Sequence, residues 1–473
     1  MIQECWCNKS RNLVSSKSSV KPRPDMLHGD LAATLKKMTL PMIMGMIMLM
    51  TFGLVDTFFV SLLGTQQLAA LSFTFPVTFT LISLNIGLGI GTSAVIARHL
   101  GSGEDAHAKE VATGALMLSS LLVGALALLG VFTIEPIFEL LGAGDNLLPY
   151  VYDYMIVWYL AGVFLAFPMV GNSILRASGD TKMPSIIMAA GGGINALLDP
   201  LLIFGWGPVP AMGIQGAAVA TAIAWGVGVV WILYLLAVRR KLILPRLLTI
   251  AELRTTSGGI LSIGLPAAGA NMLTPIAGGI MTKLVSVYGA GAVAAWGVGS
   301  RLESIASIVV LALSMSLPPL ISQNFGAAKI HRVQQAYAMS VKFVLLWQAA
   351  VFVVMWLVSP FVASTFTDDQ QVAALIQLFL TIVPLGYGLQ GIIILTNSSF
   401  NAMHKPMSAL GLSVIRLFVF FVPISYLGSL IYQLEGMFWG GVVANLLMAS
   451  VSFLWFKRTL QFNAATALAT LDR

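Results

Sequence analysis

The sequence predicts an all-α polytopic membrane protein with 12 transmembrane helices in two six-helix lobes. Hydrophobic residues make up 58% of the 473 residues and charged residues only 10%. The mean hydropathy is +0.89, and a soluble domain could not hide so much apolar side chain from water. The chain also divides into about twelve apolar runs of the roughly 20 residues that a spanning helix needs. Finally, its two halves repeat at one constant offset.

The apolar runs place the predicted helices in chain order. The first six cover residues 38–63, 73–97, 112–134, 151–175, 185–204 and 214–238, and the second six cover 259–288, 293–321, 333–358, 372–395, 407–427 and 437–456. The predicted organisation is therefore a polar N-terminal tail (1–37), an N-lobe (38–238), an inter-lobe loop (239–258), a C-lobe (259–456) and a C-terminal tail (457–473). Residues 1–25, rich in Ser, Lys and Arg, are expected to be disordered.

Charge alternates from one connecting loop to the next. One set of loops carries Lys36, Lys37, Arg98, Lys109, Arg176, Lys182, Arg239, Arg240, Lys241, Lys329, Arg332, Lys405, Lys457 and Arg458. The other set carries only the acids Glu135, Glu139, Asp145, Asp368, Asp369 and Glu435. The positive-inside rule then predicts cytoplasmic termini and an even number of spans. The net charge of +7 is read as this orientation signal and not as a nucleic-acid patch.

An internal repeat relates the two halves. Leu40-Pro41 recurs as Leu265-Pro266, and the difference between their numbers (265 − 40) defines the repeat offset. The same offset matches Val60-Ser61 with Val285-Ser286, Gly64 with Gly289, Gly101 with Gly326, Asn172-Ser173 with Asn397-Ser398, and Ala177 with Ala402. Since each half has six spans, the halves share one orientation, and their pseudo-two-fold axis runs along the membrane normal. Pro41, placed at the start of the first helix, is a candidate hinge.

Two aspartates lie deep inside predicted spans of the N-lobe. Asp56 is in the first helix and Asp199 in the fifth, and the repeat offset puts Met281 and Ile424 at the matching places. Asn195 precedes Asp199 by four residues, so both share one helix face. Ionisable groups within a span are expensive and usually functional.

Counting residues from the outer end of each predicted helix puts these groups at a similar depth in the membrane. Asp56 lies eight residues before Gly64 and Asp199 six before Gly205, which puts both roughly 10 Å below the outer surface. Tyr154 and Thr221, on the fourth and sixth helices, fall at a similar depth. Carboxyls in an apolar site resist ionisation, and a close pair readily shares a proton. The group is therefore a candidate H⁺ site, or a Na⁺ site built with the Asn195 and Thr221 oxygens.

Other polar groups are less informative. Arg301 and Glu303 either face the lobe interface or pair with neighbours, Lys283 faces the cavity or extends toward water, and Lys342 and Arg416 are expected to extend to the cytoplasmic surface. Cys5 and Cys7 are the only cysteines, both in the tail, so no metal centre is predicted.

Five segments together resemble the multidrug and toxic compound extrusion (MATE) family, most closely its DinF-like branch. They are Leu-Val-Asp56-Thr, Arg98-His-Leu-Gly-Ser-Gly, Leu175-Arg-Ala-Ser-Gly-Asp180-Thr-Lys, Asn195-x-x-x-Asp199-Pro and Gly-Ala-Ala-Val-Ala-Thr221. The resemblance implies export of organic, often cationic, compounds in exchange for an inward cation, which in DinF-like members is usually H⁺. It implies that Asp56, Asn195, Asp199 and Thr221 form the cation-coupling group, which Tyr154 joins, and that the first four also contact substrate.

The resemblance also sets the remaining expectations. Asn172 is a tentative substrate-binding residue, although its repeat mate Asn397 favours a structural role equally. The predicted seventh and tenth helices contain no Asp or Glu, which argues against the NorM-like branch. No cofactor is expected beyond H⁺, with Na⁺ as the alternative. The expected partners are small-molecule drugs, organic cations and membrane lipid, for a monomer in the bacterial inner (plasma) membrane.

Alternative functions fit less well. A flippase for lipid-linked saccharides is the nearest, but it needs a more cationic cavity than the N-lobe acids provide. A major-facilitator carrier would carry Gly-x-x-x-Asp-Arg after its second helix, which this chain lacks. An intramembrane enzyme is not expected, because the sequence contains neither His-Glu-x-x-His nor Gly-x-Ser-x-Gly.

Overall fold

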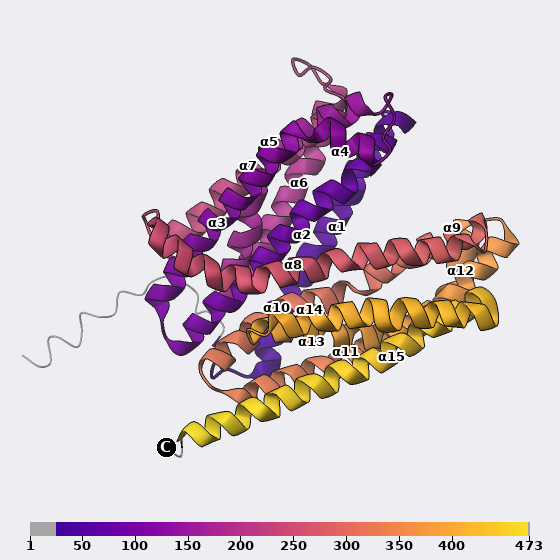
Figure 1. Ribbon diagram of the computed structural model, residues 1–473. Coiled ribbons are helices and arrows are strands. Elements are labelled where there is room, and N and C mark those ends of the chain that lie inside the picture. The colour runs from indigo at the N-terminus through magenta and orange to yellow at the C-terminus, as the bar shows by residue number, and fades with distance from the viewer. Residues whose placement is uncertain (1–24, 472–473) are drawn as a thin grey trace, which may run out of the picture.

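The computed structural model describes residues 25–471, and within that range the chain is helical apart from loops and one isolated β-bridge between Trp206 and Val209. Residues 1–24, where disorder is predicted, lie outside the described part. The helices form two bundles that meet at one end and diverge at the other (Figure 1). The predicted two-lobe, all-α class is confirmed.

The first bundle contains the helices before residue 240. They are α1 (Leu31–Ser61), α2 (Thr65–Ser102), α3 (Asp105–Phe132), the short α4 (Ile134–Leu140), α5 (Leu148–Ala177), α6 (Lys182–Phe204) and α7 (Ile214–Tyr234), which the π-helical turn η1 (Leu235–Arg239) extends. Its outer-end core gathers aromatic side chains, among them Phe138, Trp158 and Tyr159.

The second bundle repeats the plan with more interruptions. It contains α8 (Ile250–Ser286), α9 (Ala290–Ala306), α10 (Ile308–Gly326), α11 (Ile330–Phe366), α12 (Gln370–Ile382), the 3-10 turn η2 (Val383–Gly386), α13 (Tyr387–Ala402), α14 (Pro406–Val414), the π-helical η3 (Ile415–Phe421) and α15 (Val422–Leu471). The predicted spans 293–321 and 372–395 are each divided by one of these breaks.

The last two spans form one glycine-packed hairpin that runs from α14 through η3 into α15, and the reversal lies within α15. The helix is interrupted at Tyr432 and Gln433, and Gln433 has a positive φ of 53°. A Cβ on Gly428 would meet the Gly436 carbonyl, and one on Gly436 would meet the Gly428 carbonyl. Eleven segments of the described chain are long and apolar enough to cross a membrane, and the last of them, Pro406–Phe462, contains this reversal. It therefore supplies two spans, which gives the predicted 12.

The predicted starts of the first and seventh helices are wrong. α1 begins at Leu31, where the Asp30 side chain accepts a hydrogen bond from the Ala33 amide, and Pro41 lies ten residues inside it. α8 begins at Ile250, behind a capping box formed by Thr249 and Glu252. Hydropathy tracks only the part of a helix that lies in lipid, whereas side-chain caps decide where it begins. An interior proline leaves the carbonyl four residues earlier without a donor, so Pro41 weakens α1 in mid-helix.

The first helix of each lobe begins in the other lobe, where its first turns pack. Leu31, Leu35 and Met38 of α1 pack in the C-lobe core, and Ile260 and Ile263 of α8 pack in an N-lobe core. The two helices therefore cross between the lobes, as Figure 1 shows.

These two crossings obey the repeat. Thr39 of α1 and Ser316 of α10 share a buried hydrogen bond of 2.7 Å between their hydroxyls. The repeat offset turns this pair into Gly264 and Gly91, and a Cβ on Gly91 would lie 3.0 Å from the Gly264 amide. At the first crossing a hydrogen bond between two hydroxyls joins the helices. At the crossing related by the repeat, two glycines allow the helix backbones to approach closely.

The closed end lies on the pseudo-two-fold axis, where α2 meets α10. A Cβ on Gly101 would collide with the Gln323 backbone, and one on Gly326 would collide with the Arg98 backbone. The repeat offset relates Gly101 to Gly326, and it also relates Arg98 to Gln323. Ser322 Oγ donates to the Ala94 carbonyl at 2.7 Å. Backbone contact and polar bonds thus join the lobes at this end.

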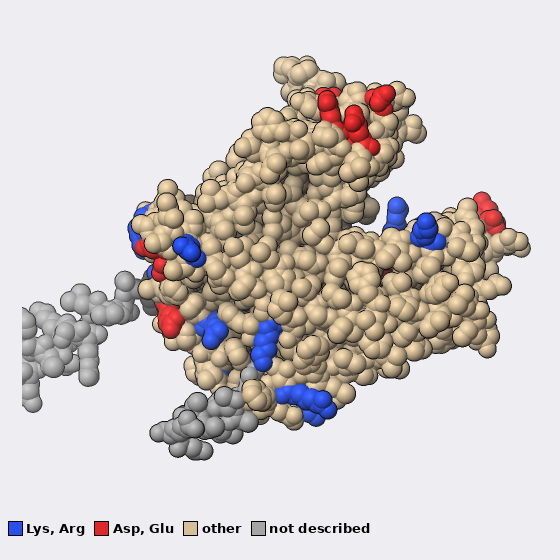
Figure 2. Space-filling view, in the orientation of Figure 1, with Lys and Arg blue, Asp and Glu red and all other residues tan. Residues whose placement is uncertain are grey.

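Charge distinguishes the two ends. Lys and Arg side chains gather toward the closed end, and acidic side chains occupy the tips of both lobes (Figure 2). The same view shows a wedge-shaped cleft between the lobes that opens toward the acidic tips.

His404, in the loop between α13 and α14, is a titratable group that packs against the closed end. Its Nε2 lies 3.2 Å from the Ala94 carbonyl, and burial, with Arg98 and His99 nearby, lowers its pKa to about 4. The neutral ring is therefore the form that fits. The contribution of neutral His404 to the stability of the closed end is fully present above the ordinary histidine pKa near 6.5, and it is lost as pH falls toward 4.

We expect acidification through this window to loosen the closed end. Spin labels across the α2–α10 contact should show a wider separation at pH 5 than at pH 7.5, and His404→Gln should remove most of that difference. His331→Gln, an exposed histidine, is the matched control. An unchanged pH response in His404→Gln would assign the effect to other groups.

Candidate functional site

α1 and α6 run parallel and in register through the N-lobe. A Cβ on Gly45 would lie 3.0 Å from Ser185, and Gly192 packs against the Phe52 ring. Both contacts pair residues separated by the same distance along the chain (185 − 45 equals 192 − 52). The register therefore places Asp56 opposite residue 196, between Asn195 and Asp199.

A hydrogen-bonded group fills that level. Asn195 Nδ2 donates to Asp199 Oδ1 at 3.3 Å and to Thr221 Oγ1 of α7 at 3.1 Å. The carboxyl groups of Asp56 and Asp199 are close enough to form a hydrogen bond when one of them holds a proton. Tyr154 of α5 is buried within electrostatic range of both. The structure thus brings together five of the residues singled out from sequence.

No cationic side chain within residues 25–471 pairs with either carboxyl. Asp199 is fully buried, and its Oδ2, like Asp56 Oδ1, has no hydrogen-bond partner. An unpaired buried carboxylate costs several kcal/mol, on the order of the penalty for one desolvated ion. Pro200 follows at once and leaves the Ala196 carbonyl without its helical donor. Such a group takes up a proton or an oxygen-seeking cation such as Na⁺. No cluster of three or more His, Cys, Asp or Glu within residues 25–471 fits a metal ion.

Asn172 is not part of this group. It lies on the same helix as Tyr154 but five helical turns farther on, which is about 27 Å along the axis. Its Oδ1 is buried without a partner, whereas its repeat mate Asn397 donates to Ser413 Oγ at 3.0 Å.

A second polar cluster occupies the C-lobe, and sequence reasoning missed it. Gln390 Nε2 of α13 donates to Glu303 Oε1 of α9 at 3.2 Å, and Arg416 of η3 lies within electrostatic range of Glu303. The expectation that Arg416 extends to the cytoplasmic surface is wrong, because its guanidinium is buried within electrostatic range of Glu303. An acid and an arginine in separate spans were the available signal, since such charges usually pair.

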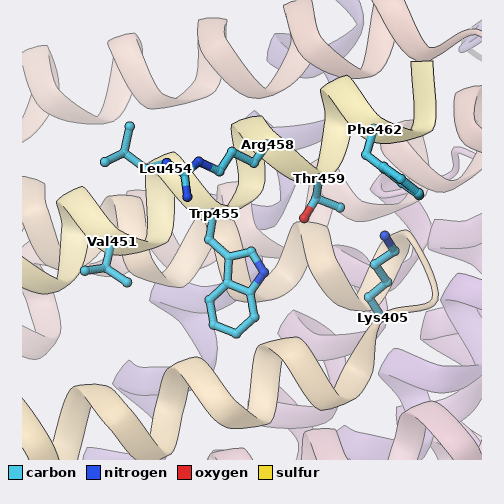
Figure 3. A pocket seen from close by; sticks show the side chains of 7 residues that line it. All are labelled: Lys405, Val451, Leu454, Trp455, Arg458, Thr459 and Phe462. Atoms are coloured by element: carbon cyan, nitrogen blue, oxygen red, sulfur yellow. The ribbon is translucent and has the colours of Figure 1, made fainter. Parts of the chain in front are cut away.

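A surface groove on the C-lobe contains none of the predicted site residues. Its lining comes from α15 and from the loop between α13 and α14, as Figure 3 shows: Lys405, Val451, Leu454, Trp455, Arg458, Thr459 and Phe462. Tryptophan beside basic residues is typical of the membrane–water interface, so the groove is not a candidate transport site.

Comparison with known proteins gives one family match in each lobe. The MatE family model matches the chain twice, over residues 41–201 and 266–427. The second match begins one repeat offset after the first, since 266 − 41 equals 265 − 40. The chain belongs to the MATE family. Its members are transporters and not enzymes, and they use ion gradients.

Individual relatives of this MATE transporter differ in substrate. It is 39% identical over 452 residues to the FAD transporter of Shewanella oneidensis, covering 96% of this chain and 100% of the relative. It is 26% identical to the multidrug export protein MepA of Staphylococcus aureus, covering 88% and 91%. The crystal structure of the Vibrio cholerae MATE transporter VcmN in the bent form matches with a TM-score of 0.87 and 34% identity, over 92% of this chain and 98% of that one. The DinF-like branch remains a prediction.

Proposed function

We propose that this MATE transporter is a secondary antiporter that exports organic compounds, drugs among them, in exchange for inward H⁺ at the Asp56–Asp199 pair. The observation that carries the proposal is a pair of neighbouring carboxyls, Asp199 fully buried and Asp56 partly buried, that has no cationic partner within residues 25–471. The proposal places both termini in the cytoplasm of a bacterial inner membrane, because the closed end is basic. The cleft then opens outward, and residues 38–238 and 259–456 act as the two lobes.

The exposure of the two acids suggests a path for the proton. Asp56 is partly exposed, whereas Asp199 is fully buried, so a proton from outside reaches Asp56 first. Sharing it with Asp199 draws α1 toward α6 and removes the charge that holds a cationic compound. Release of the proton to the cytoplasm restores the negative charge on the carboxyl pair. One charge moved across 100 mV supplies about 2.3 kcal/mol, which is enough to bias two conformations of similar energy.

Transport into vesicles tests the coupling ion directly. Reconstituted protein should move ethidium when only a pH gradient is imposed and should not respond when only a Na⁺ gradient is imposed. A response to Na⁺ alone would replace H⁺ by Na⁺ at the same group, whose Asn195 and Thr221 oxygens are suitable ligands. A response to neither gradient would overturn the antiport proposal.

Pro41 is the proposed hinge of α1, because it lies in the interior of that helix, about four turns before Asp56. Pro41→Ala restores a helical hydrogen bond and should stiffen the helix, slowing exchange about tenfold while leaving ethidium affinity within about twofold. Stopped-flow export and equilibrium binding separate the two effects. Pro360→Ala, on the exposed face of α11, is the control, and equal slowing in both variants would rule out a specific hinge.

A second candidate substrate is a flavin dinucleotide. The 39% identical relative is named as an FAD transporter, and its match covers the whole of that protein. Such a substrate is anionic, so the cleft must offer it cationic side chains.

A further inference from the structure

Two basic side chains on the C-lobe side of the cleft have no assigned role. Lys283 near the outer end of α8 and Arg301 on α9 are both exposed, and within the described residues neither has a hydrogen-bond or ion-pair partner. Figure 2 shows basic side chains over α8 and α9 along the edge of the cleft. Between residues 255 and 306 these two are the only Lys or Arg in the sequence.

The surroundings of Arg301 indicate water rather than lipid. It lies eleven residues after the start of α9 (301 − 290), about 16 Å below the outer end. The exposed residues on the same helix face are Ala294, Gly297, Ser304 and Ile305, and only Ile305 has the large apolar side chain that a lipid-facing stripe carries. A charge at that depth without a partner is stable only in an aqueous cavity.

The spacing of the two cations suits an extended anion. Counted from the turn at Gly289, Lys283 lies six residues before it and Arg301 twelve after it. Their levels in an antiparallel pair therefore differ by about 9 Å, a gap that two long, flexible side chains span together with a diphosphate. Guanidinium binds phosphate oxygens in a fork and ammonium acts as a point charge.

We propose that Lys283 and Arg301 form a subsite for the phosphate or diphosphate group of an anionic organic substrate. This inference rests on the proposed export function and defines its substrate class. The two lobes then offer opposite charges, with the partly exposed Asp56 in the N-lobe and two cations in the C-lobe. A nucleotide-like molecule lies across it with its phosphates on the C-lobe side, because Asp56 and Asp199 repel them on the other.

The step from riboflavin to FMN isolates the contribution of one phosphate, and FAD adds a second phosphate together with an adenosine. Riboflavin, FMN and FAD share one ring system and carry no, one and two phosphates. Full-length protein in nanodiscs should quench their fluorescence with affinity rising along the series. The double variant Lys283→Gln/Arg301→Gln should weaken FAD binding by at least about tenfold and leave riboflavin within about twofold. Inorganic pyrophosphate should compete with FAD in the wild type only.

Controls separate this subsite from general damage. Arg254→Gln removes an exposed cation of α8 at the closed end and should change nothing, and Arg301→Lys should keep most of the phosphate preference. Equal affinity of the wild type for riboflavin and FAD would overturn the proposal, as would equal loss of both in the double variant. Ethidium export driven by a pH gradient is measured in parallel on the wild type. Its absence from the wild type would overturn the antiport function and leave the binding result to stand by itself.

Discussion

Asp56→Asn should abolish export driven by a pH gradient and leave a folded protein. The amide keeps the shape of the side chain and its contact with Asp199 but cannot release a proton, so the coupling cycle stops. We expect the rate of ethidium export from reconstituted vesicles to fall by at least about tenfold, to the level of empty vesicles. Asp199→Asn should do the same, because the two carboxyls act as one titrating unit.

The matched control is Asp145→Asn, which removes an exposed acid from the loop between α4 and α5. It should retain wild-type export. Ethidium binding measured alongside shows whether the altered site still accepts substrate. Proton-driven export at the wild-type rate in Asp56→Asn would exclude this residue from coupling, and loss in Asp145→Asn as well would indicate general damage.

Gly101→Val and Gly326→Val should each open the closed end. Both glycines press against backbone across the pseudo-two-fold axis, where neither partner can yield as a flexible side chain could. Overpacking of this kind costs about 1–3 kcal/mol, roughly the difference between two arrangements of the lobes. The outward-open form should therefore lose about ten- to a hundredfold in population, and export should fall with it.

Distances between spin labels at Leu141 and Asp368, near the tips of the two lobes, report the change. We expect the tips to approach one another in both variants, and the double variant to add little because one contact surface is already broken. Gly258→Val on α8 is the control, since a Cβ there would meet nothing within 4 Å. An unaltered distance distribution in Gly101→Val would show that the contact does not hold the lobes together.

Composition and hydropathy were sufficient for the fold because lipid allows few solutions. Every backbone group in a span must be satisfied internally, so long apolar runs become helices. Hydropathy could not predict the breaks within helices or where each helix begins. The break between α9 and α10, the π-helical η3 and the true start of α1 at Leu31 depend on local hydrogen bonds and caps. The capping-box signature at Thr249 and Glu252 was present in the sequence and would have given the start of α8.

The C-lobe pair of Glu303 and Arg416 shows what counting along the chain misses. The two residues lie far apart in the sequence, with several helices between them, and only the packing of α9 against the bundle that holds α13 and η3 makes them neighbours. A π-helical turn changes which way every later side chain points, and no periodicity in the sequence reveals it. Depth counting worked for Asp56 and Asp199 because both helices start from the same surface and run parallel.

The sequence by itself determined the membrane environment, the two-fold repeat and the level at which Asp56, Asn195, Asp199 and Thr221 lie. Hydropathy, offset and rise per residue are properties of the chain alone. Tertiary structure decided which groups touch, how the glycines at 101 and 326 close one end, and that α1 and α8 each begin in the opposite lobe. Rotation about a helix axis and the crossing of helices are set by side-chain packing between segments remote in sequence, and that information appears only when the segments meet.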